Sequence, residues 1–139
     1  MEPHTATIGS TPGLLVVADD EPDQRALVRR VLGSLFPEVA EVGDGRELFW
    51  TMQHSVERAY VVVVTDVWMP AYDGLTVLEA CVESGWAHPI IVTTAAPSID
   101  VARRVERLGA TLLPKPYSVR ELFRVVDLTL ARGRESRPA

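Results

Sequence analysis

The chain has 139 residues, of which 47% are hydrophobic and 24% charged, a composition typical of one folded domain and not of a mainly disordered chain. Its net charge of −5 argues against general binding to nucleic acids or anionic membranes, because both attract basic surfaces. No apolar stretch approaches the length of about 20 residues that crosses a bilayer, and the first residues lack the pattern of a signal peptide. The single Cys81 cannot form an intramolecular disulfide. We therefore expect a cytoplasmic protein.

Residues 1–13 are rich in Pro, Thr, Ser and Gly, and we expect a flexible lead-in. From residue 14, short apolar runs alternate with amphipathic segments. We expect strands at 14–18, 39–42, 60–65, 89–93 and 111–113, and helices at 22–35, 45–54, 74–84, 99–108 and 119–131. This order predicts one α/β domain over 14–131, a doubly wound (βα)5 flavodoxin-like fold whose five-stranded parallel sheet has the order 2-1-3-4-5 and helices on both faces. Residues 132–139 lose periodicity and predict a flexible tail or the start of a linker.

Local signals mark the ends of several expected helices. Pro22 suits the first turn of a helix, where its missing N–H has no partner to lose. Ser118 followed by Glu121 is a capping box at the start of the last helix. Gly85 and Gly109 stand where a left-handed C-cap would end a helix.

Three groups of residues have a structural explanation. An apolar stripe at helical spacing predicts the core-facing side of the first helix, with Arg25, Arg29 and Arg30 mostly elsewhere; the stripe is Leu27, Val28, Val31, Leu32 and Leu35. Cys81 is expected to be a small core residue. The solvated face of the fourth helix is expected to carry Arg103, Arg104 and Arg107.

The apolar run that ends at Asp66 is the most informative segment. Its four consecutive valines are too apolar for a half-exposed strand and too β-branched for a helix, so they predict a central strand covered on both faces. Asp66 follows at the carboxyl end of this strand, where open parallel sheets form their ligand crevices. Taken alone, an aspartate in this position is more simply explained as a residue that caps a turn.

The other strand ends carry related chemistry. They are Asp19-Asp20 after the first strand, Thr93-Thr94 after the fourth and Lys115 after the fifth. In the expected strand order, Asp19, Asp20 and Asp66 converge, and like charges a few ångströms apart repel by about 4 kcal/mol at an effective dielectric of about 20. The cluster therefore needs a cation or a proton. For a cation, oxygen ligands select Mg²⁺, or Mn²⁺, over Zn²⁺. With Lys115 and a threonine hydroxyl beside it, such a site suits the transfer of a phosphoryl group to a carboxylate.

Together, these pieces resemble the CheY-like receiver domains of two-component response regulators. The resemblance covers residues 14–131 and rests on the ordered set Asp19-Asp20, Asp66 with Met69-Pro70 and Asp73-Gly74, Thr94-Ala95, and Lys115-Pro116-Tyr117. It implies a phosphoprotein that is phosphorylated by a sensor histidine kinase or a phosphotransfer protein. It further implies protein contacts at the face of the fourth helix, fifth strand and fifth helix, and no enzyme activity beyond the domain's own phosphorylation and slow dephosphorylation.

The resemblance also assigns roles to the metal and phosphoryl ligands. Asp66 is the phosphoacceptor and a metal ligand, Asp20 binds Mg²⁺ directly, Asp19 positions it through water, and the carbonyl of Trp68 completes the protein's metal contacts. Thr94 follows the phosphoryl oxygens during activation.

Two further implications concern Lys115. This residue pairs with the phosphoryl group or, before phosphorylation, with Asp66. The Lys115–Pro116 peptide bond is expected to be cis.

Two simpler alternatives apply to these residues. Asp19 or Asp20 can serve as the N-cap of the helix that begins near Pro22, and this role can coexist with metal binding. Thr93 can face the site in place of Thr94, because adjacent strand residues point to opposite sides; the resemblance and the small Ala95 favour Thr94.

Three positions depart from the family pattern. Leu112 stands where many receivers have an aromatic residue that swings inward with the threonine, so the usual switch is in doubt. Trp68 and Ala96 stand two residues after Asp66 and Thr94, where the family's hydrolytic water passes. A bulky indole and an apolar methyl group there predict a long-lived phosphoaspartate.

Four hypotheses follow for the function. The first is a stand-alone phosphoreceiver that signals by protein contact, with a homodimer possible. The second is a receiver from a longer regulator whose output domain lies beyond Ala139. The third is a small aspartyl-phosphate phosphatase. Such enzymes usually need a second aspartate, two residues after the nucleophile, as general acid and base, and Trp68 occupies that position in this chain. The fourth, a receiver that binds partners without phosphorylation, is disfavoured by the full set of site residues.

Overall fold

A computed structural model describes residues 13–136 of the chain, with side chains up to Arg132. Its strands are β1 (Leu14–Ala18), β2 (Glu38–Val42), β3 (Val61–Asp66), β4 (Ile90–Thr94) and β5 (Thr111–Pro114). Its helices are α1 (Pro22–Leu32), α2 (Gly45–Gln53), α3 (Gly74–Glu83), α4 (Ile99–Arg107) and α5 (Val119–Ser136), with a short 3₁₀-helix, η2 (Gly33–Leu35), after α1. The lead-in predicted for residues 1–13 lies almost wholly outside the described residues, as do residues 137–139 of the predicted tail.

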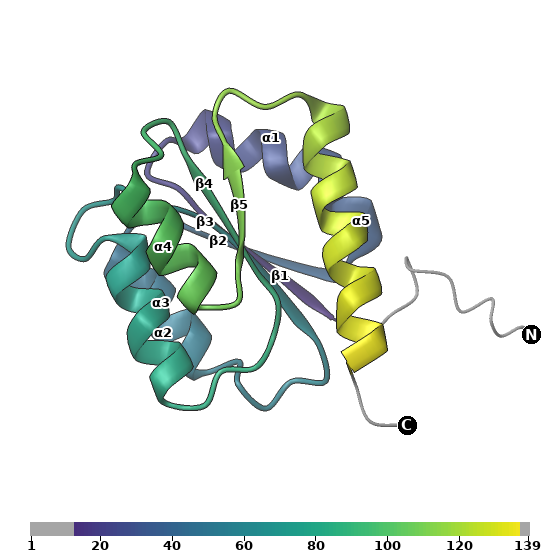
Figure 1. Ribbon diagram of the computed structural model, residues 1–139. Coiled ribbons are helices and arrows are strands. Elements are labelled where there is room, and N and C mark those ends of the chain that lie inside the picture. The colour runs from purple at the N-terminus through teal and green to yellow at the C-terminus, as the bar shows by residue number, and fades with distance from the viewer. Residues whose placement is uncertain (1–12, 137–139) are drawn as a thin grey trace, which may run out of the picture.

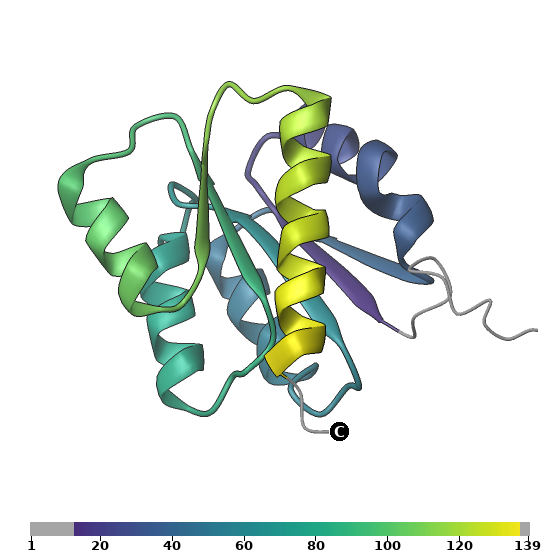
Figure 2. The ribbon, with the colours of Figure 1, turned by 45° about the vertical axis from the view of Figure 1, so that its right-hand side comes forward.

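The five strands form one parallel sheet in the order β2-β1-β3-β4-β5, which confirms the predicted topology (Figure 1). Helices α2, α3 and α4 cover one face, while α1 and α5 lie together on the other (Figure 2). The valines of β3 are at most 2% exposed because both faces of this central strand are covered. None of the helices in the described part of the chain has the length and apolarity that crossing a membrane requires.

The local signals predicted for the helix ends are confirmed. Pro22 occupies the first turn of α1. At the start of α5, the Ser118 hydroxyl accepts from the Glu121 N–H while the Glu121 carboxylate accepts from the Ser118 N–H, so two amides without helical partners are satisfied. Gly85 and Gly109 have φ angles of 111° and 72°, the left-handed backbone that favours glycine at a helix end.

Two helices, α1 and α5, end more than one residue from their predicted ends, while α2, α3 and α4 each end one residue early. The predicted first helix, 22–35, is α-helical only to Leu32 and tightens into η2, because the N–H of Phe36 bonds to the carbonyl of Gly33. The last helix continues to Ser136, five residues past its predicted end at residue 131.

Arg104 is not simply part of the solvated face of α4. Its Nε and Nη2 atoms donate to the two carboxylate oxygens of Glu79 on α3, each at 2.8 Å. This paired contact ties α4 to α3. Arg103 and Arg107 are exposed as predicted, and Cys81 is buried in the core as predicted.

Candidate functional site

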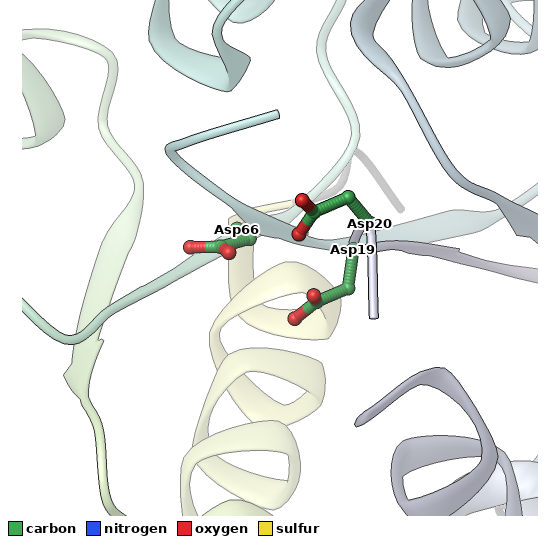
Figure 3. A group of neighbouring side chains, drawn as sticks. All are labelled: Asp19, Asp20 and Asp66. Atoms are coloured by element: carbon green, nitrogen blue, oxygen red, sulfur yellow. The ribbon is translucent and has the colours of Figure 1, made fainter. Parts of the chain in front are cut away.

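The register of the sheet brings three carboxylates together. Strands β1 and β3 are neighbours in which Ala18 pairs with Thr65, so the chain reaches Asp19 and Asp66 at the same edge. One carboxylate oxygen from each of Asp19, Asp20 and Asp66 lies within 4.8 Å of the others (Figure 3). The structure therefore brings together the three acids that the sequence singled out.

Asp66 is buried and held at both carboxylate oxygens. Its Oδ1 accepts a hydrogen bond from the Val67 N–H at 2.8 Å, and its Oδ2 lies 3.4 Å from Lys115 Nζ. Burial is the strongest influence and raises the pKa of Asp66; the Lys115 ammonium lowers it, and the charge of Asp19 raises it. The pKa of Asp66 is raised overall, so this carboxylate is harder to ionise than an exposed aspartate.

Lys115 lies between two of the carboxylates and is the only lysine in the sequence. Its Nζ donates to Asp19 Oδ2 at 2.9 Å as well as approaching Asp66. Burial lowers the pKa of Lys115, but the two carboxylates outweigh it and the pKa is raised overall. Its main-chain N–H donates to the carbonyl of Thr94, and the bond to Pro116 is cis, as predicted. The ammonium is therefore a fixed positive charge beside Asp66.

Asp19 has a partner at every polar atom. Its N–H donates to the carbonyl of Val42, and its Oδ1 accepts from the N–H of Glu21 at 3.0 Å. Its Oδ2 accepts from Lys115, and its main-chain carbonyl accepts from Arg25 Nη1 at 2.7 Å. The sequence did not single out Arg25, because helical periodicity placed it outside the apolar stripe of α1.

Asp20 is held differently from Asp19. The N-cap of α1 is Glu21, so the alternative in which Asp19 or Asp20 is the N-cap of this helix is wrong. Asp19 does bond the chain at the helix entry, through the Glu21 N–H, and this local role coexists with its place in the cluster. The Asp20 carboxylate is exposed and has no hydrogen-bond or ion-pair partner within residues 13–136.

The two threonines of β4 make different contacts. Thr93 Oγ1 donates to the carbonyl of Thr65 across the sheet at 3.4 Å, whereas Thr94 Oγ1 accepts from the N–H of Ala96 at 3.1 Å. Neither hydroxyl is bonded to the Asp66 carboxylate within the described chain, so the role of Thr94 stays a prediction. Leu112 on β5, which stands where many receivers have an aromatic residue, is half-buried and packs against the core on the side of α2 to α4.

The loop after Asp66 folds back onto it. The N–H of Gly74 donates to the carbonyl of Val67 at 2.6 Å, and a Cβ on Gly74 would lie 2.3 Å from the Asp66 carbonyl oxygen. Asp73 caps α3 by accepting from the N–H of Thr76. Asp73 and Gly74 therefore shape the loop, while the Trp68 side chain is 57% exposed and its carbonyl remains only a predicted metal ligand.

The chemistry of the donor set fits a hard divalent cation. All three side chains offer oxygen, two of them are buried, and Lys115 balances only one of the three negative charges. Mg²⁺ and Mn²⁺ prefer oxygen ligands and commonly take one or two carboxylates with waters. The cluster can therefore hold such an ion with its remaining positions open to another oxygen ligand.

Comparison with known proteins identifies the family. Residues 15–127 match the family model of the response regulator receiver domain. PdtaR of Mycobacterium tuberculosis (strain H37Rv), a transcriptional regulatory protein, is 32% identical over an alignment that covers 96% of this chain. The chain spans 64% of the length of PdtaR. The chain belongs to the receiver domains of two-component response regulators.

Solved structures agree with this assignment. The chemotaxis protein CheY4 of Vibrio cholerae is similar with a TM-score of 0.73 and 25% identity, over 86% of this chain and 99% of CheY4. A CheY-like receiver domain protein of Methanospirillum hungatei has a TM-score of 0.81 at 16% identity, over 91% of this chain and 100% of its own, and shares the fold. The flavodoxin-like, CheY-like fold predicted from the sequence is confirmed.

Proposed function

We propose that this receiver domain is phosphorylated on Asp66, in a Mg²⁺-dependent reaction, by the phosphohistidine of a histidine kinase or phosphotransfer protein. One observation carries the proposal: a buried Asp66 lies beside two further carboxylates and the ammonium of Lys115. In this proposal Asp20 binds the metal directly, Asp19 acts through water, and the Trp68 carbonyl is a further ligand.

The proposed step transfers the phosphoryl group from nitrogen to oxygen. An oxygen of the Asp66 carboxylate attacks phosphorus, an O–P bond forms, and the P–N bond breaks with its electron pair leaving on the imidazole nitrogen of the donor. Lys115 offsets negative charge on the phosphoryl oxygens from its place near Asp66 Oδ2, and the Thr94 hydroxyl donates to them after transfer. Bound Mg²⁺ would add positive charge at the same oxygens. The raised pKa of Asp66 favours its protonated, inactive form as the pH falls.

We propose that the output surface is the face built by α4, β5 and α5. Ile99 at the start of α4 is 72% exposed, and Leu128 on α5 is 49% exposed, so both elements present apolar side chains to a protein partner. Hydrogen exchange with and without beryllofluoride, a phosphoryl mimic, tests this part. Altered exchange in α4 and β5 supports it, and altered exchange confined to the loops around Asp66 contradicts it.

We consider two arrangements for the regulator to which this domain belongs. A stand-alone receiver that signals by contact is our first hypothesis, and a receiver within a longer regulator is the second, since PdtaR extends beyond the matched region. In neither arrangement does this domain alone bind nucleic acid or membrane, and its expected location is the cytoplasm.

Intact-mass measurement after exposure to acetyl phosphate tests the phosphorylation itself. The native protein should gain one phosphoryl group with Mg²⁺ present and not with EDTA, and Asp66→Asn should gain none. Asp73→Asn is a matched control, because it removes a nearby aspartate that caps α3 and leaves the acidic cluster complete. A gain that persists in Asp66→Asn contradicts the proposal.

A further inference from the structure

Arg25 links α1 to the end of β1 at the edge of the acidic cluster. Its Nη1 donates to the main-chain carbonyl of Asp19 at 2.7 Å, and its Nε lies 3.4 Å from Glu41 Oε1 on β2. The side chain is 21% exposed, so the guanidinium is largely enclosed between the Asp19 carbonyl, which accepts its hydrogen bond, and the Glu41 carboxylate, which is an ion-pair partner only. A charged donor in such a place forms a stronger hydrogen bond than a neutral one.

The carbonyl that Arg25 holds belongs to the peptide unit that carries Asp20. The Asp19 carbonyl and the Asp20 N–H lie in one rigid plane, so fixing the oxygen limits rotation of the whole plane. The Asp20 carboxylate has no partner of its own in the described chain, whereas both carboxylate oxygens of Asp19 are bonded. The direction of the Asp20 side chain therefore depends on its main chain.

We propose that Arg25 is a positioning residue for divalent-metal binding: it holds the Asp19–Asp20 peptide so that the Asp20 carboxylate faces Asp66. This role rests on the proposed function, in which Asp20 is the direct metal ligand. Arg25 touches neither the metal nor the phosphoryl group. Groups that orient metal ligands in this way typically contribute about 10–100-fold to metal affinity.

A positioning role and a purely electrostatic role of Arg25 predict opposite changes in Mg²⁺ affinity when Arg25 is removed. Removing a positive charge from the edge of an acidic cluster, by charge alone, strengthens the binding of a divalent cation. Removing a positioning residue weakens it, because part of the binding free energy is spent on ordering Asp20. The direction of the change in Mg²⁺ affinity therefore separates the two effects.

The experiment compares Arg25→Met with Arg29→Met. Arg29 is on the same helix, and its Nη1 bonds to the same Glu41 at 2.9 Å, so both variants lose one charge and one contact to this carboxylate. Only Arg25 holds the Asp19 carbonyl. Mg²⁺ affinity is measured by isothermal titration calorimetry, and thermal unfolding in EDTA checks that each variant is folded. Arg25→Met should bind Mg²⁺ about tenfold more weakly than the native protein, and Arg29→Met should bind it as tightly or more tightly.

Arg25→Lys gives a second comparison at constant charge. A lysine offers one point of contact in place of the planar fork that reaches both the carbonyl and Glu41. Its Mg²⁺ affinity should lie between those of the native protein and Arg25→Met. If Arg25→Met does not fold, Arg25→Lys is compared with Arg29→Lys, and weaker binding by the first alone supports the proposal.

Native or tighter Mg²⁺ binding by Arg25→Met overturns the proposal, as does equal weakening in the Arg25 and Arg29 variants. Because affinity is measured without a phosphodonor, this outcome is distinct from failure of the proposed function. A native protein that binds Mg²⁺ and is not phosphorylated on Asp66 contradicts the function alone. A native protein that is phosphorylated while Arg25→Met binds Mg²⁺ like Arg29→Met contradicts only the role of Arg25.

Discussion

Replacing Lys115 by methionine removes the ammonium from between Asp19 and Asp66 while keeping most of the side-chain volume. At 2.9 and 3.4 Å and an effective dielectric of about 20, each attraction is about 5 kcal/mol before solvation is counted. Breaking a buried ion pair costs about 3–5 kcal/mol in practice. The Lys115 side chain is 15% exposed, so we expect the free energy of unfolding in metal-free buffer to fall by about 2–3 kcal/mol, at or below the lower end of that range. This corresponds to a fall in melting temperature of about 10 °C.

The same change should make the domain more responsive to Mg²⁺. The internal cation that competes for Asp19 and Asp66 is gone, so Mg²⁺ should bind Lys115→Met more tightly and raise its melting temperature more than that of the native protein. Differential scanning calorimetry across a Mg²⁺ titration measures both effects. Arg103→Met, which removes an exposed positive charge on α4, is the control and should behave like the native protein. A Lys115→Met protein with native stability in EDTA and unchanged or weaker Mg²⁺ binding would refute this reasoning.

Three other substitutions test separate parts of the site. Asp66→Asn should raise the melting temperature without metal. Because the pKa of Asp66 is raised in the folded state, the native protein has its full stability at acidic pH and loses part of it as the pH rises through the folded-state pKa of Asp66, whereas asparagine does not titrate. A melting-temperature difference between the variant and the native protein that does not grow with pH would argue otherwise. Trp68→Asn should speed the loss of phosphate, followed by intact mass after the donor is removed, and unchanged or slower loss counts against a protective indole. Gly74→Ala should destabilise the fold by about 3 kcal/mol in urea denaturation, because its Cβ would meet the Asp66 carbonyl at 2.3 Å. Gly33→Ala is the control and should be nearly neutral, because its Cβ meets nothing closer than 3.7 Å. Equal destabilisation by the two substitutions would contradict a steric cause.

The sequence predicted the sheet because its signals were strong and local. Four valines in β3 mark a strand covered on both faces, and the strand order then follows from the alternation of strands and helices. The convergence of Asp19 and Asp66 could be predicted for the same reason, since residues at the carboxyl ends of neighbouring parallel strands share one edge. Their chemical roles do not follow from this placement and stay predictions.

Contacts between side chains and the main chain were not predictable in this way. Arg25 reaches the Asp19 carbonyl through a rotamer that helical periodicity does not specify, and Arg104 meets Glu79 only once α3 and α4 are packed. The early end of α1 is a change from α-helix to the 3₁₀ turn of η2, and the two forms compete closely at a helix end. These features depend on distances in space, whereas the patterns in the sequence report only which face of an element is apolar.

Chemical trapping shows which residue carries the phosphoryl group, which we propose to be Asp66. Borohydride reduces an aspartyl phosphate to homoserine, and peptide mass spectrometry then locates the reduced residue. After treatment with acetyl phosphate and Mg²⁺, we predict homoserine at position 66, and none at positions 19 and 20. Homoserine at 19 or 20, or its absence from a protein whose intact mass shows the phosphoryl gain, would contradict phosphorylation of Asp66.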